Sequence, residues 1–130
     1  ATFEVTEYGY SIQVQVDYIG ADLFIQLTGE APHIGTVTLI VKKIGQASGA
    51  FPSHSGRFHK DDVLADVLLE EIAELLPQNC VITSGVHVDG ISKEQIAGAF
   101  EMTKELASKI GTWLKIEKSP ISHPKYQTIN

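Results

Sequence analysis

Three segments that carry histidine hold the residue types best suited to binding chemistry. They are residues 32–35 around His33, residues 53–60 with His54 and His59, and residues 84–89 around His87. Imidazole nitrogens bond ligand oxygens, exchange protons near neutral pH or ligate metals. Each segment falls at the predicted end of a strand or helix, where side chains and backbone amides project into a shared cleft. We therefore expect the three segments to build one site.

The middle segment has the composition of an anion-binding loop. Small hydroxyls, a glycine and two cations precede a predicted helix, so backbone amides, the helix dipole and positive charge could meet one phosphate or carboxylate. The alternative is an ordinary polar loop that only caps the helix through its hydroxyls and Asp61 or Asp62. The candidate ligand-binding residues of this loop are Ser53, His54, Arg57, His59 and Lys60.

The same histidines are candidate metal ligands. His33, His59 and His87, with Asp89 or His54, offer imidazole nitrogens and a carboxylate that suit zinc, manganese or iron. Their spacing is long and irregular, and each could equally be a hydrogen-bonded structural residue. If they hold an ion, a small metal-dependent hydrolase or isomerase is one reading, with Asp89 orienting a ligand. The sequence contains no nucleophile elbow and no zinc-protease or zinc-deaminase motif.

Two kinds of periodicity indicate the elements that must position these segments. Apolar residues alternate with polar ones from Phe3 to Leu27, which predicts short antiparallel strands, and residues 34–44 are continuously apolar, which predicts a strand at the sheet centre. Helical spacing follows over residues 61–76, then a buried strand at about 81–88. A second helix begins at the capping box of Ser92 and Gln95 and ends near Gly111.

This order predicts an α+β fold: an antiparallel or mixed β-sheet with two helices packed on one face. Residues 1–118 are expected to form a single domain, and residues 119–130 an irregular tail that includes His123, which we take as a bystander. The other face of the sheet then needs a cover. Because residues 36–41 are apolar, we expect a second copy of the chain to provide it, in a homodimer or higher homo-oligomer.

Composition excludes several classes of function. A chain of 130 residues with 43% hydrophobic residues suits one core, and a net charge of −6 disfavours extended nucleic-acid binding. Its apolar runs are too short to cross a bilayer and no secretion signal opens the sequence, so we expect a cytoplasmic protein with no membrane partner. The single Cys80 excludes an internal disulfide and is expected in the core.

At the three segments the chain resembles the small D subunits associated with gallate decarboxylase, the LpdD-like family of prenylated flavin chaperones. The resemblance covers about residues 30–112. It rests on the Pro-His-Ile-Gly stretch at 32–35, the Phe-His-Lys-Asp-Asp stretch at 58–62, and the Ser-Gly-Val-His-Val-Asp-Gly-Ile stretch at 84–91.

The resemblance implies a non-catalytic accessory protein. Such a protein binds prenylated flavin mononucleotide (prenylated FMN), or FMN itself, and hands it to, or protects it for, a UbiD-type decarboxylase of aromatic acids such as gallate. His33, His59 and His87 stand in the matching segments and would face the ring edge or a divalent metal bridging the phosphate. Ser53, His54, Arg57 and Lys60 would receive the phosphate. The absence of an evident general base favours this function over the small metalloenzyme. A third possible function is an oligomeric scaffold with an unused cleft.

Overall fold

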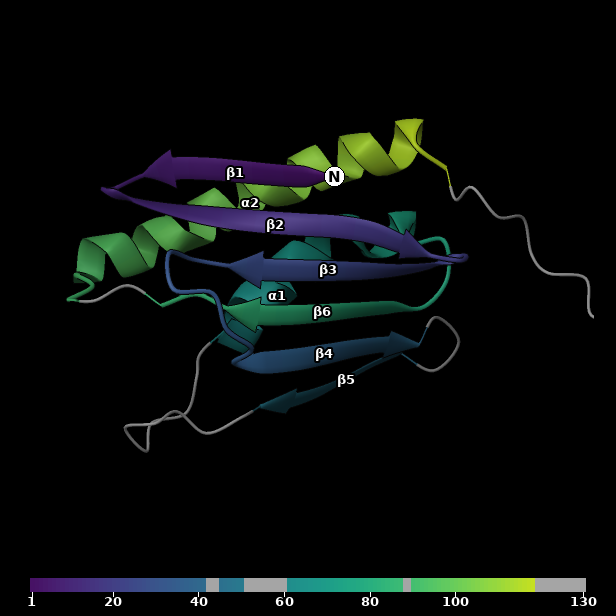
Figure 1. Cartoon of the computed structure of the whole chain (residues 1–130), viewed down its shortest axis with the longest axis horizontal. Coiled ribbons are helices and arrows are strands. Elements are labelled where there is room, and N and C mark those ends of the chain that lie inside the picture. The colour runs from purple at the N-terminus through teal and green to yellow at the C-terminus, as the bar shows by residue number, and fades with distance from the viewer. Residues whose placement is uncertain (42–44, 51–60, 88–89, 119–130) are drawn as a thin grey trace, which may run out of the picture.

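The computed structural model describes residues 1–41, 45–50, 61–87 and 90–118. These residues form six strands, two α-helices and one 3-10 turn (Figure 1). In chain order they are β1 (Thr2–Glu7), β2 (Tyr10–Ile19), β3 (Asp22–Thr28), β4 (Thr36–Val41), β5 (Gly45–Ala50), α1 (Asp61–Ile72), η1 (Ala73–Leu75), β6 (Cys80–Gly85) and α2 (Lys93–Ile116).

The strands form one mixed sheet in the order β1-β2-β3-β6-β4-β5. The predicted antiparallel meander is confirmed over β1, β2 and β3. The last strand, β6, then inserts between β3 and β4, parallel to β3 and antiparallel to β4. The C-terminal ends of β3 and β6 therefore lie at the same edge of the sheet, beside the start of β4 (Figure 1).

Both helices cover one face of the sheet, as predicted (Figure 1). Helix α2 packs on β1 and β2, α1 packs on β6 and β4, and the helices pack against each other. Alternate strand residues point into this layer because side chains alternate across a strand. They form one core with the apolar faces of the helices, and its largest fully buried members include Tyr10, Ile12, Ile25, Leu68, Ile82, Met102 and Ile110.

The prediction that residues 34–44 form the central strand is wrong. Strand β4 is second from the edge, and the central positions belong to β3 and β6. The apolar run has another cause: Thr36, Thr38 and Ile40 are buried under the helices, while the residues between them face the helix-free side. That side of β4 carries Val37, Leu39 and Val41. The sequence analysis also missed β5, whose glycine, alanine and serine residues carry little strand propensity.

Helix α2 begins as predicted and ends later than predicted. The Ser92 hydroxyl accepts from the Gln95 amide at 3.1 Å, and the Gln95 side chain accepts from the Ser92 amide at 3.0 Å, which confirms the capping box. The helix does not stop near Gly111 but continues to Ile116. Gly111 is buried in its interior, where a Cβ would lie 3.4 Å from a methyl carbon of Leu75, so close helix packing explains this glycine better than termination.

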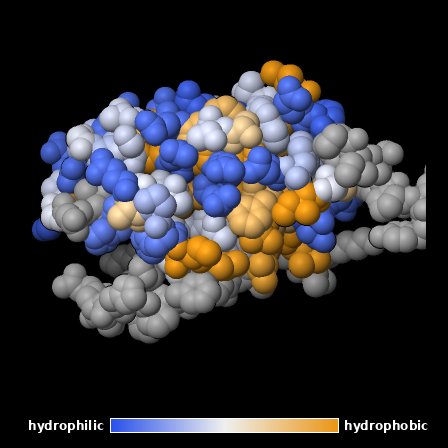
Figure 2. Space-filling view, viewed as in Figure 1, coloured by the Kyte–Doolittle hydropathy of each residue, from blue (hydrophilic) through white to orange (hydrophobic). Residues whose placement is uncertain are grey.

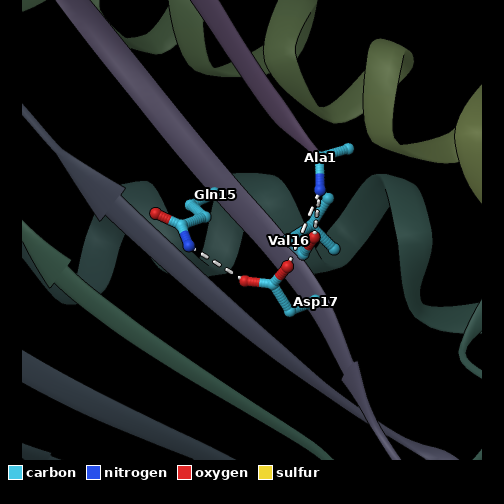
Figure 3. A network of polar contacts seen from close by, with 4 residues as sticks. All are labelled: Ala1, Gln15, Val16 and Asp17. Carbon is cyan, nitrogen blue, oxygen red and sulfur yellow. Dashed lines mark hydrogen bonds and ion pairs between the residues drawn. The ribbon is translucent and has the colours of Figure 1, made fainter.

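The first strands are tied to α2 and to each other by polar contacts. The Tyr10 hydroxyl donates to the Gln95 carbonyl oxygen at 2.8 Å, and the Gln95 amide group donates to the Tyr8 carbonyl oxygen at 2.8 Å. At the opposite end of β2, the Ala1 nitrogen donates to the Val16 carbonyl oxygen at 2.8 Å and lies 3.7 Å from Asp17 (Figure 3). The contacts of Gln95 hold the start of α2 at the edge where β3 and β6 end.

Candidate functional site

One edge of the sheet gathers the described histidines of the predicted site. Here β3 and β6 end, β4 begins, and both helices start (Figure 1). In open α/β sheets, ligands bind outside the carboxyl ends of the parallel strands, and β3 and β6 are the parallel pair of the described strands. The positive ends of two helix dipoles lie at the same edge, which favours an anionic ligand there. We call this region the histidine edge; its described residues are 29–36 and 84–87.

Glycines allow three chain segments to meet at the histidine edge. A Cβ at Gly85 would collide with the His33 carbonyl group, and one at Gly29 would lie 3.1 Å from a methyl carbon of Val86. Backbone bonds join the same segments: the Gly35 amide donates to the Ser84 carbonyl oxygen at 2.9 Å, and the Gly29 amide donates to the Gly85 carbonyl oxygen at 3.3 Å. The two histidine segments, 54 residues apart in sequence (87 minus 33), are thereby brought together.

His33 and His87 form an edge-to-face pair at this junction. Their ring centroids are 6.5 Å apart and the rings are inclined by 76°. His33 is half-buried and His87 is exposed. His33 Nδ1 lies 2.9 Å from the Ala31 carbonyl oxygen, which can only accept, so this nitrogen carries the proton. With Nδ1 as the donor, Nε2 is the ring nitrogen that can accept a hydrogen bond.

Three fully buried hydroxyls lie on the helix-covered side of the same edge. Thr36, Thr38 and Ser84 each have 0% exposure, and their oxygens have no hydrogen-bond partner among the described residues. A buried hydroxyl left without a partner costs about 1–3 kcal/mol. We call these residues the hydroxyl cluster. The sequence analysis did not identify them, because threonine in a strand usually only reflects strand propensity.

The remaining predicted ligand-binding residues lie outside the described part of the chain. Ser53, His54, Arg57, His59 and Lys60 all fall in residues 51–60, and Asp89 falls in residues 88–89. Their assignment to the cofactor or to a metal stays a prediction. The structure thus brings together His33 and His87, and the middle segment lies outside the described residues.

A metal site is not formed by the described residues alone. Within residues 1–41, 45–50, 61–87 and 90–118, no three His, Cys, Asp or Glu side chains are grouped to hold an ion. Two imidazoles on one tetrahedral zinc place their centroids about 5 Å apart, because each zinc–nitrogen bond is about 2.0–2.1 Å. Rings at 6.5 Å would have to approach each other and gain further ligands, such as the predicted His59.

Cys80 is a core residue, as predicted, and burial reduces the reactivity of its thiol. Burial, with a smaller contribution from Asp22, raises the pKa of its thiol to about 12. We expect native protein at pH 8 to react with iodoacetamide roughly 1000-fold more slowly than unfolded protein, because the thiolate is the reactive form. The free energy of unfolding should also fall as pH rises from about 9 towards 12, since the Cys80 thiol ionises first in the unfolded state. Cys80→Ala should remove this contribution of the thiol.

Mass spectrometry of the alkylated protein measures the first effect, and denaturant titrations of wild type and Cys80→Ala between pH 8 and pH 10.5 measure the second. The raised pKa values of Tyr10 and Tyr18 act in the same direction at higher pH, so the comparison with Cys80→Ala isolates the thiol. Native alkylation as fast as that of the unfolded chain would contradict the burial of Cys80.

Among the described residues, none of the helices is long and apolar enough to span a membrane.

Comparison with known proteins shows the family of this chain. Residues 6–115 match the prenylated flavin chaperone LpdD-like domain. The chain is 40% identical over 127 residues to Protein LpdD of Lactiplantibacillus plantarum, covering 97% of this chain and 93% of that protein. The resemblance found in the sequence is confirmed: this chain belongs to the family of LpdD-like prenylated flavin chaperones.

Proposed function

We propose that this protein is a non-catalytic chaperone that binds prenylated FMN at the histidine edge. It supports the maturation or protection of this cofactor for a UbiD-type decarboxylase of aromatic acids such as gallate, and it acts in the cytoplasm. The observation that carries the proposal is the family match over residues 6–115, which includes both histidine segments of the edge. The match also supports the proposal that residues 1–118 form one domain.

The chemistry of the edge suits such a ligand. Prenylated FMN supplies a phosphate, a polar ring edge and an apolar prenyl-derived ring. The N-termini of the two helices and the ring nitrogens of His33 and His87 favour binding of the phosphate and the polar ring edge. Exposed apolar side chains flank the histidine segments, with Ile34 at 57% and Ile91 at 38% exposure, and suit the apolar part. When bound, the cofactor supplies chemistry only to its client enzyme, so this chain needs to bind, orient and shield it.

Binding without turnover is the property to test first. Native mass spectrometry of the protein mixed with prenylated FMN or with FMN, with metal content read from the same sample, measures both ligand and ion. We expect selective retention of prenylated FMN by the folded chain, and faster activation of a UbiD-type apoenzyme when the loaded chain is the cofactor source. Stoichiometric metal without any flavin would reject the chaperone proposal and favour the small metalloenzyme.

We also propose that the helix-free sheet face joins two copies of the chain. Hydrophobic surface gathers on the β4 and β6 half of this face, and the β1 and β2 half is mostly hydrophilic (Figure 2). Leu39 is 46% exposed there, beside Val37 and Val41 of β4 and Val81 of β6. An exposed apolar patch rimmed by polar residues is typical of a protein interface.

Leu39→Asp is expected to convert the homodimer into monomers at micromolar concentration, because a carboxylate would be buried unpaired at the interface. Sedimentation velocity measures the state of wild type and variant. Thr6→Asp, an exposed change on the hydrophilic half of the same face, is the matched control and should leave the dimer intact. A wild-type monomer at these concentrations, or a Leu39→Asp dimer as stable as wild type, would reject this interface.

A further inference from the structure

The hydroxyl cluster lies on β4 and β6, close in the chain to the two histidine segments. Thr36 pairs with Ser84 in the β4–β6 ladder, and Thr38 pairs with Ile82 two residues further along. Opposite residues on one face of such a pair are about 5 Å apart and diagonal ones about 7–8 Å. Ser84 precedes Gly85, the glycine that contacts His33. Thr36 and Ser84 therefore form the last pair of the ladder, next to the histidine edge, and Thr38 lies diagonally behind them on the same face.

These hydroxyls differ from the fully buried threonine hydroxyl of helix α2. Thr103 in α2 is also 0% exposed, but its hydroxyl donates to the Ala99 carbonyl oxygen at 2.7 Å. The three members of the cluster have no such partner in the described part of the chain. Valine at either threonine would fill the same volume without a buried polar atom. Their position at the proposed binding edge suggests that a ligand supplies the missing partners.

We propose that the hydroxyl cluster is a subsite for a neutral hydrogen-bonding group of the bound flavin, with both donors and acceptors, and that the phosphate stays outside it. This inference rests on the proposed function. A hydroxyl can donate and accept, so three of them complement a group that does the same, such as the pyrimidine edge of the ring or the ribityl chain. The three hydroxyls are uncharged, so the cluster itself offers a phosphate dianion no counter-charge.

The test compares ligand affinity with the stability of the free protein. In the full chain, Thr36→Val, Thr38→Val and Ser84→Ala are combined, and each threonine change is also made alone in case the triple variant does not fold. Dissociation constants are measured for prenylated FMN, FMN, riboflavin and lumiflavin, which lacks the ribityl chain. Thr103→Val is the matched control, since it removes a buried hydroxyl that already has its partner.

We expect the triple variant to bind prenylated FMN at least tenfold more weakly, while the thermal midpoint of the free protein stays the same or rises. A purely structural role would lower the midpoint and leave affinity unchanged. Thr103→Val should show no loss of affinity. If lumiflavin also binds more weakly, the ring edge occupies the subsite; if FMN and riboflavin bind more weakly and lumiflavin does not, the ribityl chain occupies it.

Unchanged affinity of the triple variant and of both single variants would overturn the subsite and leave the proposed function standing. Such a result would mean that the cluster only holds water or turns towards its own chain. Failure of the wild-type protein to bind any of the four flavins would overturn the proposed function, and the subsite with it. The two failures are thereby distinguished in one series of titrations.

Discussion

Replacing His87 with alanine is expected to weaken the binding of prenylated FMN by about 10- to 100-fold, because a hydrogen bond to a charged ligand group contributes about 1.5–3 kcal/mol. His87 is exposed, so the thermal midpoint should hardly change. Isothermal titration of wild type and variant with prenylated FMN, together with a thermal melt of each, measures both quantities. Loss of affinity at constant stability is what a ligand-contacting side chain at the histidine edge predicts.

Two further variants sharpen the His87 experiment. His87→Gln keeps a hydrogen-bonding side chain but is a poor metal ligand, so retained affinity would indicate a direct hydrogen bond, and loss of both affinity and metal would indicate metal ligation. His123→Ala is the matched control, since the sequence assigns His123 to the tail and gives it no role. Equal affinity of wild type and His87→Ala would mean that the ligand does not contact this part of the edge.

Replacing Gly85 with alanine is expected to destabilise the protein by about 3 kcal/mol, because an added methyl would overlap the His33 carbonyl group and force backbone to move. For a domain of this size, such a loss lowers the thermal midpoint by about 10 °C. The same movement separates His33 from His87, so prenylated FMN should bind more weakly even well below the midpoint. Thermal melts and titrations at low temperature measure the two effects.

Gly111→Ala is the matched control for Gly85→Ala. Gly111 is equally buried, but its added methyl would meet only the end of the Leu75 side chain at 3.4 Å, and alanine favours the helix. We expect a stability within about 1 kcal/mol of wild type and unchanged flavin affinity. Should Gly85→Ala melt and bind like wild type, the close approach of His33 to β6 would be wrong, and with it the geometry of the histidine edge.

Much of the local structure could be predicted from sequence because it depends on neighbouring residues. The alternation from Phe3 to Leu27 gave the first three strands, and the capping box of Ser92 and Gln95 gave the start of α2. Predictions failed where a residue's role depends on a distant partner. Gly111 has the appearance of a helix end, and only its packing against Leu75 explains why the helix continues.

The candidate site divides in the same way. The sequence by itself was enough to predict the fold class, the family and the choice of His33 and His87 as candidate ligand-binding residues. These predictions depend on residue types in short segments. Only the tertiary structure decided that β6 inserts between β3 and β4, which places Gly85 against His33 and Thr36 opposite Ser84. Strand order depends on the free energy of burying side chains far apart in sequence, and no local pattern records which distant strand becomes the neighbour.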